Sequence, residues 1–351
     1  MSFRTIINRD GSQWMKGAGP DQDVVIGSRI RLARNIRGIP FPGAASHEER
    51  EKVLQMAKGA TALAKNLGQI DFVPLGDVSP LDRRLLVERH LISPQLAASG
   101  KDSSVILRDD EAVSIMVNEE DHIRIQVLFP GLQLKAAWEM CNRLDDLYSE
   151  QLDFAFSPDL GYLTACPTNL GTGLRASVML HLPGVTITNQ IRRILSAMGS
   201  FGLVVRGLYG EGTEVVGNIY QISNQVTLGP SEEEIISHLE NITRQIIAQE
   251  REVREALLKQ GEIEDRLYRS YGVLAHARSI NSHEAMQLLS DVRLGIDMGL
   301  FKGLKPTILQ ELLVLIRPAH LQKMVGREMD AGERDRQRAA LIRERIRTLQ
   351  D

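Results

Sequence analysis

Residues 166–175 read Cys-Pro-Thr-Asn-Leu-Gly-Thr-Gly-Leu-Arg, and this stretch decides how the rest of the chain is interpreted. The cysteine stands directly before a proline, which favours an extended backbone at Cys166. The Gly-Thr-Gly turn allows the main chain to approach a ligand closely, because glycine carries no side chain. An apolar run from Val178 to Leu182 follows and predicts a strand. A thiol and a guanidinium on either side of one turn indicate a site where an anion meets a nucleophilic substrate.

Two common phosphate-binding motifs do not fit this stretch. A Walker A loop requires Gly-Lys-Ser/Thr after its glycines, and no such sequence follows here. A dinucleotide-binding fingerprint requires a third glycine three residues after Gly173, and this chain lacks it. The turn therefore belongs to neither class.

The composition is that of an ordinary soluble globular protein. The chain has 351 residues, 43% hydrophobic and 25% charged, and is long enough for two domains. A net charge of −3 gives no basic field, so direct binding of nucleic acid is not expected. Residues 1–11 lack the apolar core of a signal peptide, and no apolar run reaches membrane-spanning length. With only two cysteines and no membrane segment, we expect a cytoplasmic protein.

Local signals place helices and strands around the central stretch. A capping box at Ser46–Glu49 starts a helix that is expected to run to about residue 68. Ser79-Pro80 starts a second helix, which we expect Ser93-Pro94 to end. Three β-rich runs follow, and then a long amphipathic helix that carries Cys141 as a core residue. The runs and the helix cover Ser104–Leu107, Ala112–Val117, Ile125–Phe129 and Leu132–Phe154.

The Cys166–Arg175 stretch resembles the signature of the guanidino phosphotransferases, the creatine and arginine kinases, and more narrowly of the McsB-type bacterial protein arginine kinases. That resemblance implies the α+β class, with a catalytic domain at about 1–228 built on a mostly antiparallel sheet flanked by helices. From Ser231 onward, a capping box and the absence of strand signals predict an all-helical C-terminal domain, 231–351. Small-guanidine kinases carry their helical domain before the catalytic one, so this order resembles the McsB branch. The resemblance also implies ATP and Mg²⁺ as cofactors.

Alternating arginines mark the first predicted strand, residues 24–34. Arg29 and Arg31 alternate with apolar residues, which places both guanidinium groups on one face of a strand. Taken alone, a solvated basic face on an edge strand is the simpler interpretation, because arginine is mostly exposed. The resemblance implies instead that both hold ATP phosphates, together with Arg124, Arg175 and Arg206.

An acidic motif, Asn-Glu-Glu-Asp-His-Ile-Arg at 118–124, lies between two apolar strands. A run of acids ordinarily indicates an exposed loop. The flanking strands press this one toward the core side of a sheet, and the resemblance implies that Glu120 contacts the substrate guanidinium. A glycine-rich loop after Leu203–Arg206 supplies a second carboxylate, Glu211. Creatine kinases carry an apolar residue at that position, so Glu211 favours an arginyl substrate.

The chemistry explains why a kinase of arginine needs these groups. A guanidinium is protonated at almost any pH, with a pKa above about 12, so it is a poor nucleophile. Glu120 is the candidate general base, and Glu211 would also bind the substrate guanidinium when its loop closes. Cys166 is expected to act as a thiolate that orients the cationic substrate and not as a covalent phosphate carrier. Since the sequence shows no acidic metal cage, Mg²⁺ is expected on phosphate oxygens and water.

Two further groups of residues are carried over from the resemblance. Small-guanidine kinases usually place histidines near the nucleotide at the positions of Leu107 and Met179, so we expect an apolar adenine pocket here. Near the C-terminus, Arg334, Asp335 and Arg338 resemble the phosphoarginine-binding motif of the McsB branch. The alternative for the second group is a solvated terminal helix with internal ion pairs.

Three functions remain open. The first is a protein arginine kinase that marks proteins for Clp-type degradation under stress. The resemblance implies for it a zinc-binding activator protein, a Clp-family unfoldase and homodimers formed through the helical domain. The second, a kinase of free arginine or another small guanidine, is disfavoured because no N-terminal domain closes over the site. The third, a non-catalytic nucleotide-binding adaptor, is disfavoured because the candidate carboxylates, thiol and five arginines are all present.

Overall fold

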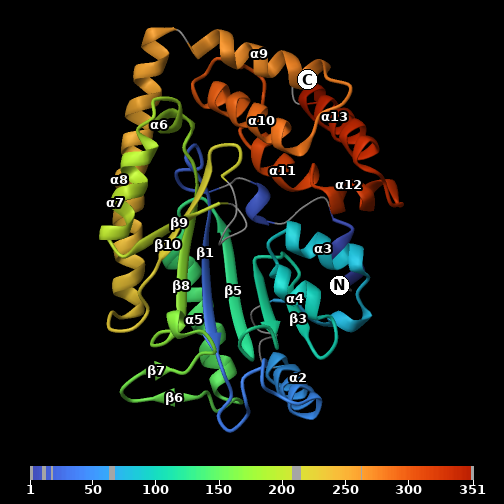
Figure 1. The fold of residues 1–351 in the computed structure, drawn as a ribbon, viewed down its shortest axis with the longest axis vertical. Helices are drawn as coiled ribbons and strands as arrows, with labels where there is room; N and C mark the ends of the chain where they lie inside the picture. Colours follow the sequence, from blue (N-terminus) through green and yellow to red (C-terminus); the bar gives the residue numbers. More distant parts are fainter. Residues whose placement is uncertain are drawn as a thin grey trace.

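The strands of this protein form one eight-stranded sheet and one two-stranded hairpin in the part of the chain that the computed structural model describes, residues 3–9, 13–16, 19–62, 68–207, 215–261 and 263–348 (Figure 1). Every neighbouring pair in the large sheet is antiparallel, and the order is β2-β3-β4-β5-β1-β8-β10-β9. The strands are β1 (Val25–Arg34), β2 (Ile70–Pro74), β3 (Ser104–Arg108), β4 (Val113–Val117), β5 (Ile123–Pro130), β6 (Phe156–Ser157), β7 (Gly161–Tyr162), β8 (Leu174–His181), β9 (Leu203–Arg206) and β10 (Ile219–Asn224). The predicted α+β class is confirmed.

One face of the sheet carries the main hydrophobic core. Alternate residues of β1, Ile30 and Leu32, are fully buried there beside Cys141 and Leu144 of α5 (Leu134–Ser149). Burial raises the pKa of the Cys141 thiol, as expected for a cysteine that serves as a small core residue. Because side chains alternate along a strand, Arg29 and Arg31 lie on the opposite face. The predicted helix at 132–154 is shorter than expected at both ends.

The helices at the N-terminal side follow their capping residues, with one correction. In α2 (His47–Thr61) the predicted capping box is present, since Glu49 N donates to Ser46 Oγ and Ser46 N to Glu49 Oε2. The expectation that Ser93-Pro94 ends a helix is wrong. Helix α3 (Pro80–Glu88) ends earlier, before His90 with a φ of 60°, and Ser93 is the N-cap of α4 (Pro94–Ser99). A serine followed by proline satisfies the first turn of a helix and so begins one.

The short remaining helices before residue 231 connect strands or flank the sheet. They are α1 (Phe3–Ile7), the 3₁₀ turns η1 (Gln13–Lys16), η3 (Leu75–Asp77) and η4 (Pro167–Asn169), α6 (Pro183–Ile187) and α7 (Ile191–Ser200). The strand predicted from Val178 begins earlier, at Leu174, so Arg175 lies inside β8.

From Ser231 the described chain is helical, as predicted, and the capping box at Ser231 is present. None of its described helices is long and apolar enough to cross a membrane. Long helix α8 buries Ile235, Leu239 and Ile246 in the main core, so it packs on the sheet. The other helices build a second core together with Trp14 and Met15. The division into two domains at 228–231 stays a prediction. The helices are α8 (Glu232–Gln260), α9 (Ile263–His276), α10 (Ser282–Asp297), α11 (Ile308–Leu315), α12 (Pro318–Val325) and α13 (Ala331–Thr348).

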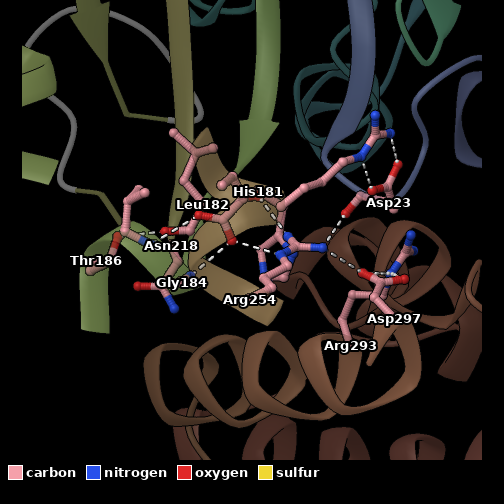
Figure 2. Close-up of polar contacts among 12 residues, drawn as sticks. Asp23, His181, Leu182, Gly184, Thr186, Asn218, Arg254, Arg293 and Asp297 are labelled. Atoms are coloured by element: carbon pink, nitrogen blue, oxygen red, sulfur yellow. Dashed lines mark hydrogen bonds and ion pairs between the residues drawn. The ribbon is translucent and has the colours of Figure 1, made fainter. Parts of the chain in front are cut away.

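A buried network of charges joins these helices to the end of the sheet (Figure 2). The carboxylate of Glu250 accepts hydrogen bonds from Gly184 N at 2.8 Å, from Val185 N at 2.9 Å and from Arg254 Nε at 2.7 Å. Arg254 also donates to the carbonyl of His181, the last residue of β8, and pairs with Asp297 at 3.3 Å. Burial raises the pKa of Asp297 despite the attraction of its arginine partners. Each buried charge therefore depends on the others.

We expect Arg254→Met to lower the free energy of unfolding by about 3–5 kcal/mol, because it leaves Glu250 buried without its cation. The measurement is urea unfolding followed by circular dichroism. The matched control is Arg269→Met, whose ion pair with Asp265 is 78% exposed on both sides and should contribute less than about 1 kcal/mol. Equal losses in the two variants would contradict a structural role for the network.

Candidate active site

Two adjoining hollows lie on the sheet face opposite α5 and form one cleft. The first, of about 210 Å³, is lined by Glu120, Cys166 and Arg175, with Thr168, Asn169 and Gly173 beside them. The second, of about 400 Å³, is lined by Arg29, His90, Gln126 and Gln221, among others. Both hollows share Arg31, Arg124 and Arg206. The structure thus brings all five predicted phosphate-binding arginines, one predicted carboxylate and the predicted thiol to one place.

Strand register explains why the arginines converge. In the sheet, Arg31 of β1 is opposite Arg175 of β8, and the neighbouring Ala33 is opposite Arg124 of β5. Residues directly opposite each other in an antiparallel pair point to the same face. Arg206 of β9 is opposite Gln221 of β10 on the same side. Four separate strands therefore deliver five guanidinium groups to one surface.

The arginine cluster carries more positive than negative charge. Among the described lining residues, the carboxylates are Glu119 and Glu120, against five arginines. Burial, followed by repulsion from Arg124 and Arg175, lowers the pKa of Arg29 to about 10. Burial, followed by repulsion from Arg29, Arg124 and Arg175, lowers the pKa of Arg31 well below its ordinary value, and its buried Nε has no partner among the described residues. A polyanionic ligand would satisfy these groups, because phosphate oxygens accept charge-assisted hydrogen bonds.

The two glutamates of the acidic motif have different environments. Both pair with Arg124, Glu119 at 2.5 Å and Glu120 at 2.9 Å. The Glu119 side chain is only 1% exposed, whereas that of Glu120 is 34% exposed. The motif forms a tight turn in which Asn118 has a φ of 57°, and two of its three acids, Glu119 and Asp121, are buried. Glu120 is the carboxylate that remains accessible from the cleft.

Asp121 connects the two halves of the site and was not singled out from the sequence. Its Oδ1 accepts from Asn35 Nδ2 at 2.6 Å and from Ala165 N at 2.8 Å, and the residue is fully buried. Asn35 Oδ1 in turn accepts from His122 N at 2.9 Å. Since Asp121 follows Glu120 and Ala165 precedes Cys166, this carboxylate holds the base candidate and the thiol in fixed relation. The only signal in the sequence is its place within a motif flanked by strands.

The Cys166 loop is held by its own chain. Cys166 Sγ lies 3.0 Å from Thr168 Oγ1, and Thr227 Oγ1 donates to the carbonyls of Thr168 and Leu170. A Cβ on Gly171 (φ 103°) would lie 2.4 Å from Thr227 O, and one on Gly173 (φ 66°) 2.6 Å from Ala33 O. These glycines are thus required for packing within the protein. Of the two, Gly173 also lines the first hollow.

The predicted adenine residues are not brought together. Leu107 is opposite Ser114 on β4, and Met179 is opposite Gln221 on β10, so both lie on the cleft face of the sheet. Each is covered, Leu107 by the core around α3 and Met179 by the core of the helical region. Neither lines the two hollows, and their role stays a prediction. Glu211 falls within residues 208–214, outside the described part of the chain.

The C-terminal motif lies in the helical region. Arg338 of α13 is 2% exposed and donates to the carbonyls of Ile316 and Ile280, both at 2.9 Å, and to Asp335 at 2.5 Å. Arg334 donates to Met329 O at 2.9 Å. These contacts join three segments of the region. Phosphoarginine binding by Arg334, Asp335 and Arg338 stays a prediction.

Several cleft residues were missed by sequence reasoning. Gln126 donates to Ser114 Oγ and His90 O, and Gln221 accepts from Arg29 at 2.8 Å. Burial, and then the charges of Arg29 and Arg317, lower the pKa of His90 to about 3, so its ring is neutral at pH 7. For Gln126 and Gln221, the available signal in the sequence was a polar residue within an otherwise apolar strand. No group of three or more His, Cys, Asp or Glu side chains that could hold a metal occurs among the described residues.

Comparison with known proteins gives matches along the whole chain. Residues 52–253 match the ATP:guanido phosphotransferase C-terminal catalytic domain, and residues 260–351 match the protein-arginine kinase McsB C-terminal domain. A protein-arginine kinase of Halothermothrix orenii is 53% identical over 348 residues, 99% of each chain. One of Brevibacillus brevis is 51% identical over 355 residues, 100% of this chain and 99% of the relative.

Solved structures resemble the fold as well. A lombricine kinase structure matches with a TM-score of 0.59 and 30% identity, covering 71% of both chains. A duplicated taurocyamine kinase from Schistosoma mansoni matches with a TM-score of 0.58 and 27% identity, covering 72% of this chain and 36% of that one.

We expect inorganic triphosphate to stabilise the protein through the arginine cluster, by about 2.7 kcal/mol at a hundredfold excess over its Kd. In Arg31→Met this gain should shrink by about 1.4 kcal/mol or more, the equivalent of a tenfold loss of affinity. Without ligand, the same variant should be at least as stable as the parent, since it removes a half-buried guanidinium that the neighbouring arginines repel. Thermal unfolding with and without triphosphate measures both. An unchanged gain in Arg31→Met would refute the assignment, and Arg269→Met serves as the control.

His90 should make stability depend on pH. Because its pKa is lowered in the folded state to about 3, the unfolded chain binds the proton first. The stability that neutral His90 contributes to the folded state is therefore fully present above about pH 6.5. It is lost as the pH falls from 6.5 toward 3. We expect His90→Gln to reduce the slope of unfolding free energy against pH in this window by up to about 1.4 kcal/mol per pH unit. His181 is shifted the same way, so the difference between variant and parent is the quantity to measure. Identical slopes would show that His90 titrates normally.

Proposed function

The chain belongs to the ATP:guanido phosphotransferase family, in its protein-arginine kinase branch, and on this premise we propose that it transfers the γ-phosphoryl group of ATP to arginine side chains of proteins. One observation carries the proposal. The accessible carboxylate Glu120 and five guanidinium groups line a single cleft, so a cationic acceptor and an anionic donor can be held side by side. Phosphoryl transfer depends mainly on such alignment and charge neutralisation.

The arginines hold the donor. Arg29, Arg31, Arg124, Arg175 and Arg206 bind the ATP phosphates, and the unpartnered Nε of Arg31 fits a phosphate oxygen. When bound, MgATP supplies the phosphoryl group that is transferred. Mg²⁺ is carried on phosphate oxygens and water, its usual ligands. The adenine base would lie on the side of the second hollow, and contact with Leu107 or Met179 stays a prediction because neither residue lines that hollow.

The carboxylates prepare the acceptor. Glu120 binds the guanidinium of the substrate arginine and takes a proton from it as the N–P bond forms and the bond from phosphorus to the ADP oxygen breaks. Arg124 and the buried Glu119 hold Glu120 in place, and Asp121 fixes it relative to Cys166. Cys166 orients the guanidinium, and Glu211 supplies a second carboxylate to bind it.

Further parts of the proposal come from the resemblance alone. We propose a catalytic domain at 1–228 and a helical domain at 231–351 that forms homodimers and binds phosphoarginine through Arg334, Asp335 and Arg338. The protein acts in the cytoplasm, in stress regulation, and its products are degraded by a Clp-type machine. A zinc-binding activator protein and a Clp-family unfoldase are the corresponding partners.

We expect Glu120→Ala to lower kcat for protein-arginine phosphorylation by about 10²–10⁴-fold, the usual contribution of a general base. Cys166→Ala should also lower kcat, with ATP binding changed less than turnover in both variants. The assay supplies ATP with an unstructured Arg-containing protein or with free arginine and detects acid-labile phosphate. The fold of Glu120→Ala should persist, because Arg124 keeps its bond to Glu119.

The same assay separates the alternative functions. Phosphorylation of free arginine alone would favour a small-guanidine kinase, and no phosphorylation of either acceptor would favour an adaptor. Parental rates in both Glu120→Ala and Cys166→Ala would rule out the mechanism.

A further inference from the structure

One wall of the second hollow is formed by the chain that runs from the end of α3 into α4. We call the residues of this segment that line the hollow the α3–α4 wall, and they are Val87, His90, Ile92, Ser93, Pro94 and Gln95. His90 has a φ of 60°, in the left-handed region that residues with a side chain rarely adopt. Such a backbone conformation persists only where neighbouring contacts hold it. The contacts that hold the wall therefore help to shape the hollow.

Glu88, inside this segment, is bonded to the helical region. Its carboxylate accepts from the backbone nitrogen of Ala319 at 2.9 Å and from that of His320 at 3.0 Å, in the first turn of α12. The N-cap residue of α12, Arg317, makes no side-chain capping bond, so Glu88 supplies an anionic cap from a distant part of the chain. Helices α3 and α12 lie side by side (Figure 1).

His320 joins this cap to the next residue of the segment, Arg89. Its Nδ1 lies 3.3 Å from Glu88 Oε2, and its Nε2 lies 3.1 Å from Arg89 Nε. Because a guanidinium can only donate, Nε2 is the acceptor, and the ring proton on Nδ1 donates to Glu88. The His320 side chain is only 4% exposed, so water does not replace these bonds easily. One imidazole therefore ties two successive residues beside the wall to α12.

Arg89 is the point at which several segments meet. It is 2% exposed and donates to the carbonyls of Ile6 at 3.0 Å and Arg9 at 2.6 Å, and to Glu111 Oε1 at 2.9 Å. The N-terminal segment, the turn between β3 and β4, and α12 are thus joined at the residue directly before His90. A displacement of α12 would disturb this junction.

A second, independent contact links His90 to the helical region. The rings of Trp14 and His90 meet edge to face with centroids 5.4 Å apart, and Trp14 belongs to the core that the C-terminal helices build. From the sheet, Gln126 donates to the carbonyl of His90 at 2.7 Å. The wall is therefore held between the sheet on one side and the helical region on the other.

We propose that Glu88 and His320 are positioning residues for ATP, which hold α12 against α3 and thereby fix the α3–α4 wall on the nucleoside side of the cleft. The arginine cluster projects from the strands, so its grip on phosphates does not depend on this junction. Docking of the helical region and binding of the nucleoside then stabilise each other, because such coupling is reciprocal. The proposal rests on the proposed function and makes the helical region part of its nucleotide site.

The test compares ATP with inorganic triphosphate, which lacks the nucleoside. In Glu88→Ala we expect the Kd for ATP to rise about tenfold and the Kd for triphosphate to change by less than about twofold, a coupling of ordinary size. Glu88→Gln should show a smaller rise, since its amide oxygen can still accept one of the two backbone bonds. Isothermal titration calorimetry of the full chain measures both constants.

His320→Phe keeps a ring in place and removes both nitrogen contacts, so it should also weaken ATP binding selectively. Because Glu88 and His320 act through one junction, the double variant should lose less than the two single losses multiplied together. The matched control is Lys323→Met, which removes an ion pair with Asp82 at 2.7 Å. That pair joins the same two helices at the start of α3, away from the wall, and its loss should leave both Kd values unchanged.

The parent protein provides a test that needs no variant. Hydrogen exchange of the Ala319 and His320 amides, which donate to Glu88, should slow more with ATP than with triphosphate at equal saturation. Equal slowing by the two ligands would overturn the proposal. Unchanged ATP binding in Glu88→Ala, an equal loss of ATP and triphosphate binding in it, or an equal loss of ATP binding in Lys323→Met would overturn it as well.

Failure of this proposal and failure of the proposed function give different results. If the parent phosphorylates protein arginine and Glu88→Ala binds ATP as tightly as the parent, only the positioning role fails. If Glu88→Ala loses ATP binding selectively but the parent phosphorylates neither protein nor free arginine, the positioning role holds and the proposed function fails.

Discussion

The cost of holding five guanidinium groups on one surface is the constraint on which the rest of the structure depends. Arg29 and Arg31 sit beside other arginines in a partly dry cleft, where burial and mutual repulsion both disfavour their charged forms. Only a rigid support can keep such groups together without ligand. The antiparallel sheet provides this support. Four of the arginines project from inner strands, which are hydrogen-bonded on both sides, and Arg206 projects from the edge strand β9, which pairs with β10.

The protein contains two kinds of buried arginine, and the difference between them marks the site. Arg34, Arg254 and Arg338 each meet carboxylates and backbone carbonyls that satisfy their guanidinium groups. These residues join segments that are far apart in sequence. By contrast, Arg29 donates to the neutral side chains of Gln221 and Ser177, and the buried Nε of Arg31 has no partner among the described residues. Under-compensated charge of this kind is typical of a binding site.

The helical region contacts α3 close to the cleft, in addition to the end of the sheet. Glu88 of α3 accepts from the backbone of Ala319 at 2.9 Å and of His320 at 3.0 Å, at the start of α12. The next residue, Arg89, is buried and donates to Glu111 at 2.9 Å. His90 follows directly and lines the second hollow. The region therefore helps to position a wall of the second hollow.

The sequence by itself determined the elements whose signals are local. Alternation along residues 24–34 placed Arg29 and Arg31 on one face, and capping residues placed the helix starts at Ser46 and Ser231. The family motifs at 118–124 and 166–175 supplied the candidate site residues, and the structure brings those it describes into one cleft. Ser93-Pro94 was misread because the pair can stand at the end of one helix and the start of the next, and only the backbone decides between them.

Tertiary structure alone decided how the candidates differ from one another. Whether Glu119 or Glu120 stays accessible depends on how the 118–124 turn packs against the rest of the protein, and no local sequence pattern determines that packing. The covering of Leu107 and Met179 depends on helices that pack over the sheet from elsewhere in the chain. The link through Asp121 exists because β1, the acidic turn and the Cys166 loop meet in space. Such contacts join residues far apart in sequence, and their energies depend on burial that only the folded chain creates.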